Sequence, residues 1–154
     1  MRLHGLGGGG RIAPAQGSHD GAVFGQRFFD AAQRESAWRQ RMLARPSRDT
    51  RIGILGLGDI GGTIANSLLP FDFQLTGCSS SRQKILGVKS FAGESELPQF
   101  LARCDYLVCV LPLTDETRGI IDAKLLAQLP QGAWVINVAR GAHLIEEDLI
   151  AALD

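Results

Sequence analysis

Short apolar runs and amphipathic segments alternate along the last two-thirds of the chain. The apolar runs predict strands at Arg51–Leu55, Phe73–Cys78, Val88–Phe91, Tyr106–Leu111 and Trp134–Val138. Apolar residues recur at helical spacing over Ile60–Leu69, Ser95–Arg103, Asp122–Leu129 and Glu146–Leu153. Pro70 would end the first of these helices, Pro98 would lie in the first turn of the second, and Asp122 would cap the third. Strands that alternate with helices are typical of a parallel sheet, so the pattern predicts an α/β protein.

A glycine motif joins the first predicted strand to the first predicted helix. It reads Gly56-Leu57-Gly58-Asp59-Ile60-Gly61, the spacing G-x-G-x-x-G that in this setting is typical of dinucleotide binding. Gly56 would permit a tight turn, Gly58 the approach of a pyrophosphate, and Gly61 close packing of the helix on the strand. The helix N-terminus would offer free N–H groups to the phosphates. The alternative is a merely structural turn, because a chain with 19 glycines can reach these spacings by chance.

The motif makes the predicted fold more specific. Right-handed connections would arrange the five strands in the order 3-2-1-4-5, which is a Rossmann-type doubly wound parallel sheet. Ligands bind such a sheet beyond the carboxyl ends of its strands, where the strand order reverses. The loops after the first and fourth strands meet there, so we expect the functional residues in these loops.

The chain before residue 51 has a different composition. Residues 1–20 are rich in glycine and have no apolar period, so we expect this segment to be flexible. Residues 21–45 predict a helix, with apolar side chains at helical spacing over Ala22–Leu43. A polar linker, Arg45–Thr50, leads into the nucleotide-binding domain predicted for residues 51–154.

Composition and charge exclude several classes of function. Sixteen basic residues balance sixteen acidic ones, so no overall field favours nucleic acid or a membrane surface as a partner. No apolar run is long enough to cross a bilayer. The three cysteines, Cys78, Cys104 and Cys109, fall in or beside predicted strands, where we expect small buried thiols in the reducing cytoplasm. No cluster of cysteine and histidine has zinc-like spacing, so the sequence predicts no metal site.

The loop after the second predicted strand bears on the choice of cofactor. An NAD site places a carboxylate here to accept the ribose hydroxyls, but the chain reads Cys78-Ser79-Ser80-Ser81-Arg82. Hydroxyl groups and a guanidinium suit the extra 2′-phosphate of NADP, so we expect NADP(H) to be preferred over NAD(H). NAD(H) stays an open alternative, and so does a solvated polar loop without a binding role.

Several segments of the chain resemble the sequence of a known family. They are SFAGESELPQFLARCDYLVCVLPLTDETRGIID, LLAQLPQGAWVINVARG and HLIEEDLIAALD, together with GLGDIG and the CSSSR loop. In this order they resemble the NAD(P)-binding domain of the D-isomer-specific 2-hydroxyacid dehydrogenases, most closely the glyoxylate/hydroxypyruvate reductase A branch. The resemblance covers residues 51–154, and FFDAAQRESAW is similar to the helix that these enzymes place before the first strand.

The resemblance implies a role for residues in each loop. The pyrophosphate would contact Gly56, Gly58, Asp59, Ile60 and Gly61, and the adenosine ribose or its phosphate Ser79, Ser80 and Arg82. The nicotinamide side would be bordered by Leu111, Pro112, Thr117, Val138 and Ala139. Arg140 would be the catalytic residue, holding the carboxylate of a 2-keto acid and polarising its carbonyl group. The alternative for Arg140 is a surface ion pair with Glu146 or Glu147.

Two other groups invite a catalytic interpretation. Histidine is a common general base, so His143 could act as one, but the family uses a different histidine, and we expect a loop residue that lines the cleft. The acidic run Glu146-Glu147-Asp148 could pass for paired catalytic carboxylates. It is more simply a set of negative charges in the first turn of a helix.

The family pattern departs from the chain at both ends. Nothing in the chain maps onto the family's general-acid histidine or the glutamate that orients it, so we expect a C-terminally incomplete domain from a longer enzyme. The fifth strand would then expose an unpaired edge. The resemblance implies NADPH-dependent reduction of a small 2-keto acid such as glyoxylate or hydroxypyruvate. It also implies that the protein forms a homodimer. Because the two catalytic residues have no counterpart here, we expect little or no activity for this chain alone. A nucleotide-binding module without turnover and a non-binding fragment are the competing hypotheses.

Overall fold

The computed structural model describes residues 2–3 and 45–153. Most of the segment expected to be flexible and the helix expected over 21–45 therefore lie outside the described residues. The chain divides into two compact units, Met1–Gly8 with Ser47–Asp154, and Gly9–Pro46.

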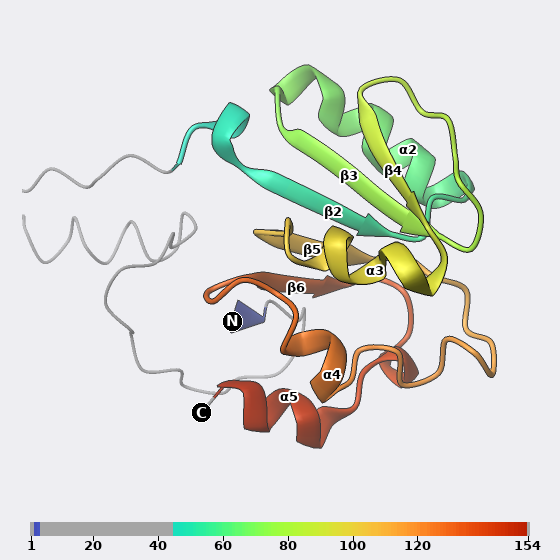
Figure 1. Ribbon diagram of the computed structural model, residues 1–154, viewed down its shortest axis with the longest axis vertical. Helices are drawn as coiled ribbons and strands as arrows, with labels where there is room; N and C mark the ends of the chain where they lie inside the picture. Colours follow the sequence, from blue (N-terminus) through green and yellow to red (C-terminus); the bar gives the residue numbers. More distant parts are fainter. Residues whose placement is uncertain (1, 4–44, 154) are drawn as a thin grey trace, which may run out of the picture. The chain divides into compact units, whose positions relative to one another are not determined.

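A single parallel sheet forms the middle of the first unit, with its strands in the order β1-β6-β5-β2-β3-β4 (Figure 1). The strands are β1 (Arg2–Leu3), β2 (Arg51–Leu55), β3 (Gln74–Ser79), β4 (Val88–Ala92), β5 (Tyr106–Cys109) and β6 (Trp134–Asn137). The five strands predicted from the apolar runs thus lie in the order 3-2-1-4-5. The Rossmann-type fold is confirmed, with strand ends displaced by at most two residues.

Helices fill the connections between the strands. They are α2 (Asp59–Leu68), α3 (Gly93–Leu101), α4 (Ala123–Leu126) and α5 (Glu146–Leu153), with 3-10 turns η1 (Ser47–Asp49), η2 (Leu69–Phe71) and η3 (Gly141–His143). The Asp122 carboxylate accepts a hydrogen bond from Leu125 N at 2.7 Å, which confirms the predicted cap of α4. Among the described residues, no helix has the length and hydropathy to cross a bilayer.

Of the two prolines in the helical connections, Pro98 differs from the prediction and Pro70 agrees with it. Pro98 lies inside α3 rather than in its first turn, because the helix begins two residues earlier than the apolar pattern indicated. A proline inside a helix has no N–H to donate to the carbonyl four residues earlier, so α3 lacks one of its hydrogen bonds there. The helix α2 ends at Leu68, before Pro70, as predicted. Pro70 then lies in the first turn of η2, where a missing N–H has no consequence.

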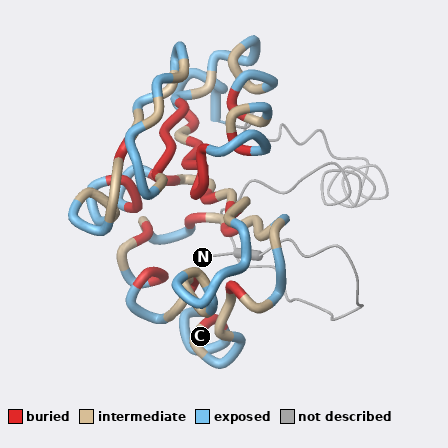
Figure 2. Tube along the Cα trace, turned by 90° about the vertical axis from the view of Figure 1, so that its right-hand side faces the viewer, coloured by how far each residue is buried: buried red, intermediate tan, exposed pale blue. Residues whose placement is uncertain are grey.

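The sheet is covered on both faces, and two apolar clusters result. The larger cluster contains Phe100, Leu101, Leu107 and Ile121, all fully buried. The smaller cluster, Ile54, Leu57 and Ala65, lies between β2 and α2. Figures 1 and 2 show α2 and α3 on opposite faces and the most buried segments along the central strands. All three cysteines are free and buried, as predicted.

The start of β2 is tied to the start of β5 by a charged pair. The Asp105 carboxylate accepts hydrogen bonds from Arg51 Nη2 at 2.6 Å, from Arg51 Nε at 3.1 Å and from the Arg51 backbone N–H at 2.9 Å. These hydrogen bonds raise the pKa of the Arg51 guanidinium. The pair fixes the amino ends of the central strands, opposite the edge where the loops with predicted functions meet.

The edge at β6 corrects one prediction. The backbone of Arg2 pairs with Trp134 and that of Leu3 with Val135, so the edge is not unpaired along its whole length. The rest of the segment expected to be flexible, residues 4–20, lies outside the described part of the chain. The physical reason is that an exposed strand offers unsatisfied N–H and C=O groups, which any extended neighbour can bind. A two-residue strand carries no apolar period, so the sequence pattern could not predict it.

Candidate functional site

Four loops with predicted functions leave the carboxyl edge of the sheet together. The turn after β2 is joined to β3 by the hydrogen bond from Gly56 N to Cys78 O at 2.8 Å. The loop after β5 begins where Val110 N donates to Leu55 O at 3.0 Å, and the loop after β6 where Val138 N donates to Cys109 O at 3.2 Å. The motifs that lie far apart in the sequence are therefore neighbours at this edge, as the parallel sheet predicts.

The glycines of the motif have the geometry that each position requires. Gly56 has φ +106°, which L side chains rarely adopt, and turns the chain away from β2. A Cβ atom at Gly61 would lie 1.8 Å from Gly56 O, so only glycine lets the helix approach the strand this closely. A Cβ atom at Gly58 would meet no protein atom within 4 Å. The space beside Gly58 is open, which leaves room for a ligand.

The N-terminus of α2 faces this open space with unsatisfied donors. Gly58 is the N-cap residue, and it has no side chain that could accept from the first N–H groups of the helix. The first N–H with a helical partner is that of Gly62, which donates to Gly58 O at 2.7 Å. Asp59 and Ile60 are exposed beside it. Free N–H groups and the positive end of a ten-residue helix suit a phosphate group.

The loop after β3 holds its side chains in a local network. Ser79 Oγ donates to Ser81 O at 2.7 Å, and Ser80 is exposed. Arg82 Nη1 donates to Ser90 O at 2.6 Å, and Nη2 donates to Glu96 Oε1 at 2.5 Å. Sequence reasoning missed Glu96. The available signal was its place in the first turn of the helix after the strand that pairs with β3.

The loop after β5 contacts the glycine turn. A Cβ atom at Gly56 would lie 3.2 Å from Leu111 Cδ2, so Leu111 packs directly over the turn. Thr117 Oγ1 donates to Pro112 O at 2.6 Å and accepts from Thr114 N at 2.8 Å. The hydroxyl of Thr117 thus stabilises the shape of its own loop.

The loop after β6 presents two of the predicted residues to solvent. Val138 is 59% exposed, and Ala139 N donates to Asn137 Oδ1 at 3.1 Å. Arg140 is exposed, and its Nη1 donates to Ala139 O at 3.0 Å. The ion pairs between described residues do not include one of Arg140 with Glu146 or Glu147. No hydrogen bond between described residues joins its guanidinium to the glycine turn.

His143 differs from the prediction because it is fully buried rather than a loop residue that lines the cleft. Its Nδ1 lies 3.3 Å from Arg140 N and 3.0 Å from Arg140 O, and its Nε2 lies 3.3 Å from Pro112 O. Its own carbonyl accepts from Ile121 N at 2.8 Å. The imidazole therefore joins the loop after β6 to the loop after β5. A buried ring was not expected because a histidine two residues after a glycine gives no apolar signal.

The acidic run at the start of α5 agrees with the simpler interpretation, that of negative charges in the first turn of a helix. Glu146, Glu147 and Asp148 lie in the first turn of α5, as predicted for charges at the positive end of a helix. Asp148 Oδ2 also accepts from Ala123 N at 2.8 Å and so joins α5 to α4. Among the described residues, no group of three or more His, Cys, Asp and Glu side chains is placed to hold a metal ion.

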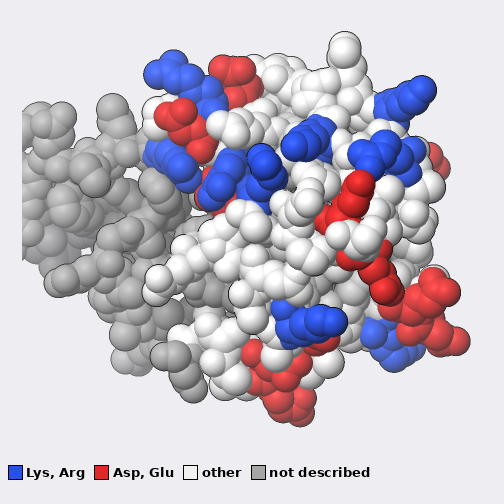
Figure 3. All heavy atoms as spheres, viewed as in Figure 1, with Lys and Arg blue, Asp and Glu red and all other residues white. Residues whose placement is uncertain are grey.

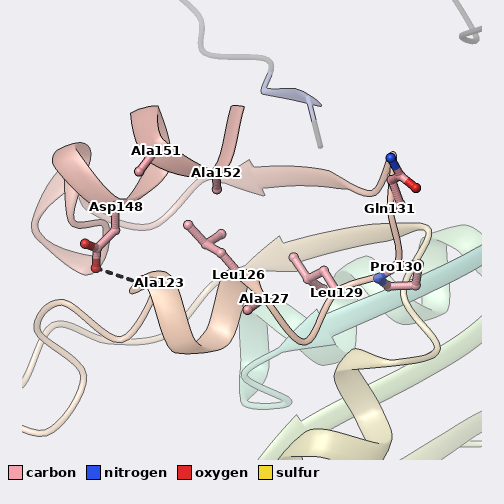
Figure 4. A pocket seen from close by; sticks show the side chains of 9 residues that line it. All are labelled: Ala123, Leu126, Ala127, Leu129, Pro130, Gln131, Asp148, Ala151 and Ala152. Carbon is pink, nitrogen blue, oxygen red and sulfur yellow. Dashed lines mark hydrogen bonds between the residues drawn. The ribbon is translucent and has the colours of Figure 1, made fainter. Parts of the chain in front are cut away.

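A separate depression of about 420 Å³ lies between α4 and α5 (Figure 4). Its lining is mostly apolar and consists of Ala123, Leu126, Ala127, Leu129, Pro130, Gln131, Asp148, Ala151 and Ala152. No predicted site residue lies in it. The charges of both signs are interspersed on the face drawn in Figure 3, which agrees with the balanced composition.

The chain matches a known family over most of its length. Residues 24–154 match the family described as "D-isomer specific 2-hydroxyacid dehydrogenase, NAD binding domain". The chain is also similar to a D-isomer specific 2-hydroxyacid dehydrogenase from Xanthobacter autotrophicus Py2, solved in complex with NADPH and MES. The two are 45% identical with a TM-score of 0.73, and the match covers 82% of this chain and 52% of that one.

Two further solved structures with bound NADP are similar. One is the NADPH-dependent glyoxylate/hydroxypyruvate reductase from Sinorhizobium meliloti with NADP and sulfate, at 36% identity and TM-score 0.73, covering 86% of this chain and 43% of that one. The other is a probable 2-hydroxyacid dehydrogenase from Rhizobium etli with NADP, HEPES and L(+)-tartaric acid, at 36% identity and TM-score 0.71, covering 84% and 42%. The chain spans about half the length of these relatives or less.

Proposed function

The chain belongs to the D-isomer-specific 2-hydroxyacid dehydrogenase family, and from this premise we propose that it binds NADP(H) for the reduction of a small 2-keto acid to the 2-hydroxy acid. The substrate class is that of glyoxylate and hydroxypyruvate. The relative from Sinorhizobium meliloti, whose name states this activity, supports the class. The dinucleotide would lie across the carboxyl edge of the sheet, over the four loops described above.

The pyrophosphate would rest on the turn between β2 and α2. The open space beside Gly58 and the free N–H groups at the start of α2 support this placement, because they supply both room and hydrogen-bond donors. Asp59 and Ile60 would contact the same group from the first turn of the helix. This combination of an unfilled approach and unpaired donors is the single observation that carries the proposal.

The choice of NADPH over NADH would depend on the loop after β3. Ser79, Ser80 and Arg82 would contact the 2′-phosphate through hydroxyl and guanidinium donors. The end of β3 carries no carboxylate of its own that could accept the ribose hydroxyls of NAD. Two of the similar structures contain NADP and one NADPH, which supports the same preference.

The nicotinamide side would be formed by the loops after β5 and β6. Leu111, Pro112 and Thr117 would border it on one side, and Val138 and Ala139 on the other. When bound, the cofactor supplies a hydride to the carbonyl carbon of the substrate. Arg140 would hold the substrate carboxylate and stabilise the negative charge that develops on the carbonyl oxygen, since its guanidinium is permanently charged and has no carboxylate partner among the described residues.

Turnover also needs a proton donor for the carbonyl oxygen. His143 does not have the geometry for this role, because its ring is buried and both nitrogens face backbone groups of Arg140 and Pro112. We therefore expect the chain to bind the nucleotide with little or no turnover by itself. The resemblance also leads us to expect a homodimer, which a measurement of the molar mass in solution would detect.

Titration of the purified protein with NADPH and with NADH tests the proposal. We expect saturable binding of both, with NADPH bound more tightly by about tenfold to a hundredfold, the range expected for one charge-assisted hydrogen bond. An Arg82→Asp variant should lose this preference. Absence of saturable binding of either nucleotide would refute the proposal.

A second experiment addresses the substrate. The oxidation of NADPH is followed in the presence of glyoxylate, with wild-type protein and an Arg140→Gln variant compared. Arg140→Gln should leave NADPH binding unchanged if, as proposed, the side chain contacts the substrate and not the nucleotide. Turnover equal to that of a full-length relative would show that the expectation of a binding module without efficient catalysis is wrong.

A further inference from the structure

The side chain proposed to contact the 2′-phosphate already forms hydrogen bonds with other residues of the protein. Arg82 lies on a loop without helix or strand structure, yet its guanidinium donates to Ser90 O at 2.6 Å and to Glu96 Oε1 at 2.5 Å. Its side chain is 57% exposed and that of Glu96 is 33% exposed. The rest of the loop is anchored beside it, since Gln83 N donates to Ser90 Oγ at 3.0 Å.

The topology of the sheet explains why Glu96 lies within reach of this loop. The last residue of β3, Ser79, pairs with the last residue of β4, Ala92, and α3 starts immediately afterwards. Glu96 Oε2 accepts a hydrogen bond from Ala92 N at 2.8 Å, which fixes the carboxylate at the end of β4. That hydrogen bond, more than the contact with Arg82, lowers the pKa of Glu96, so the group is charged at neutral pH.

We propose that Glu96 is a positioning residue for NADPH selectivity, holding the Arg82 guanidinium where it meets the 2′-phosphate. The inference rests on the proposed function, because it assigns to Arg82 the phosphate of NADPH. Glu96 itself contacts no phosphate in this proposal. It acts through Arg82, by limiting the conformations of a long side chain before the nucleotide arrives.

The geometry favours this role over competition between the carboxylate and the phosphate. A guanidinium has five N–H donors, and the contacts with Ser90 and Glu96 use two of them. The remaining donors suffice for a two-point contact with a phosphate oxygen pair. The charge of Glu96 is also partly compensated by the Ala92 N–H and by the positive end of α3, which weakens its repulsion of a bound phosphate.

A purely structural role for Glu96 is the competing explanation. A carboxylate that accepts from Ala92 N stabilises the start of α3 whether or not Arg82 is present. Loss of such a cap would lower the stability of the fold and would change the affinities for NADPH and NADH by the same factor. The ratio of NADPH to NADH affinity is therefore the readout that separates the two roles.

The test measures dissociation constants of NADPH and NADH for the whole chain and for Glu96→Gln and Glu96→Ala variants. We expect NADPH affinity to fall in the order wild type, Gln, Ala, by about three- to fivefold for Ala, the upper part of the range typical of an exposed ion pair. NADH affinity should change by less than about twofold. Glu94→Gln is the matched control, because it removes the same charge from the same helix turn without a contact to Arg82.

An Arg82→Ala background completes the cycle, since in it Glu96→Ala should not change the ratio any further. Circular dichroism establishes that each variant is folded, and the glutamine variant remains informative if the alanine variant is not. A ratio that stays constant would show that Glu96 is only a helix cap, and a ratio that rises would show competition; either result overturns the inference alone. Wild-type protein that binds neither nucleotide would overturn the proposed function as well.

Discussion

The glycines of the turn after β2 stand in three different steric environments. Gly56 has a positive φ and lies under Leu111, Gly61 touches the carbonyl of Gly56, and Gly58 faces open space. Only the first two are therefore required by the fold itself. The fold does not require a glycine at position 58, so we attribute this glycine to the proposed approach of the pyrophosphate.

This difference predicts opposite results for two alanine variants. Gly58→Ala should fold with a loss of no more than about 1 kcal/mol, since its Cβ meets nothing and its φ of −73° suits any residue, although alanine is a poorer N-cap than glycine. It should weaken NADPH binding at least about tenfold by filling the approach. Gly61→Ala should lower the free energy of unfolding by about 1–3 kcal/mol, because its Cβ would overlap Gly56 O. Urea denaturation and nucleotide titration measure the two effects. A Gly58→Ala variant that binds NADPH like the wild type would contradict the proposed place of the pyrophosphate.

His143 predicts a second effect at the scale of one residue. Replacing its buried ring by leucine leaves the backbone groups of Pro112 and Arg140 without their partner, at a cost of about 1–3 kcal/mol in the free energy of unfolding. His143→Gln retains a donor and an acceptor and should lose less. Denaturation curves of the two variants give the comparison. Equal stability of His143→Leu and the wild type would show that the ring does not join the two loops.

At the scale of elements, the short helix α4 depends on side chains outside its own four residues. The Asp122 carboxylate accepts from Leu125 N, and Asp148 of α5 accepts from Ala123 N. Two carboxylates thus satisfy the free N–H groups of a helix that is too short to be stable by its own propensity. The fully buried Ile121 and the buried Leu125 lie beside these caps, so the caps also hold part of the larger cluster.

Removal of one cap should therefore destabilise the protein measurably. We expect Asp122→Ala to lower the free energy of unfolding by about 1 kcal/mol, while Asp122→Asn, which keeps an accepting oxygen, stays closer to the wild type. Thermal unfolding followed by circular dichroism compares them. If the two variants melted at the same temperature as the wild type, the hydrogen bond to Leu125 N would carry no stabilising role.

The elements also show what the sequence pattern could predict. Five strands and α5 follow directly from apolar runs and helical spacing, and the order of the strands follows from their alternation with helices. The strand β1 could not be predicted, since two residues have no period, and the burial of His143 depends on two loops that meet only in the folded chain. Glu96 was missed for the same reason, because its neighbour Arg82 lies 14 residues away in sequence.

At the scale of the whole molecule, all three thiols lie inside the sheet and its covering helices. Burial raises the pKa of Cys104 to about 12, and it also raises the pKa values of Cys78 and Cys109. Cys104 Sγ donates to Phe100 O at 3.2 Å and fills the space beside Gly53. The folded protein therefore keeps these protons at a pH where the unfolded chain has lost them.

This predicts a loss of stability in alkaline solution. Above the ordinary thiol pKa of about 8.5 the unfolded state binds fewer protons than the folded state, so the free energy of unfolding should fall as the pH rises toward 12, by up to about 1.4 kcal/mol per pH unit for Cys104. The slope should decrease in a Cys104→Ala variant. Denaturation midpoints between pH 8 and pH 11 measure it. An identical slope in both proteins would mean that Cys104 ionises equally in the two states.

The rings of Tyr106 and Trp134 are stacked across β5 and β6, with centroids 6.1 Å apart and planes inclined by 17°. At this separation light absorbed by the phenol passes to the indole, so the native protein should emit almost entirely at tryptophan wavelengths when tyrosine is excited. Separation of the two strands would restore the emission of Tyr106, the only tyrosine in the sequence. With Trp38 replaced by phenylalanine, the ratio of tyrosine to tryptophan fluorescence would therefore report whether β5 and β6 are paired.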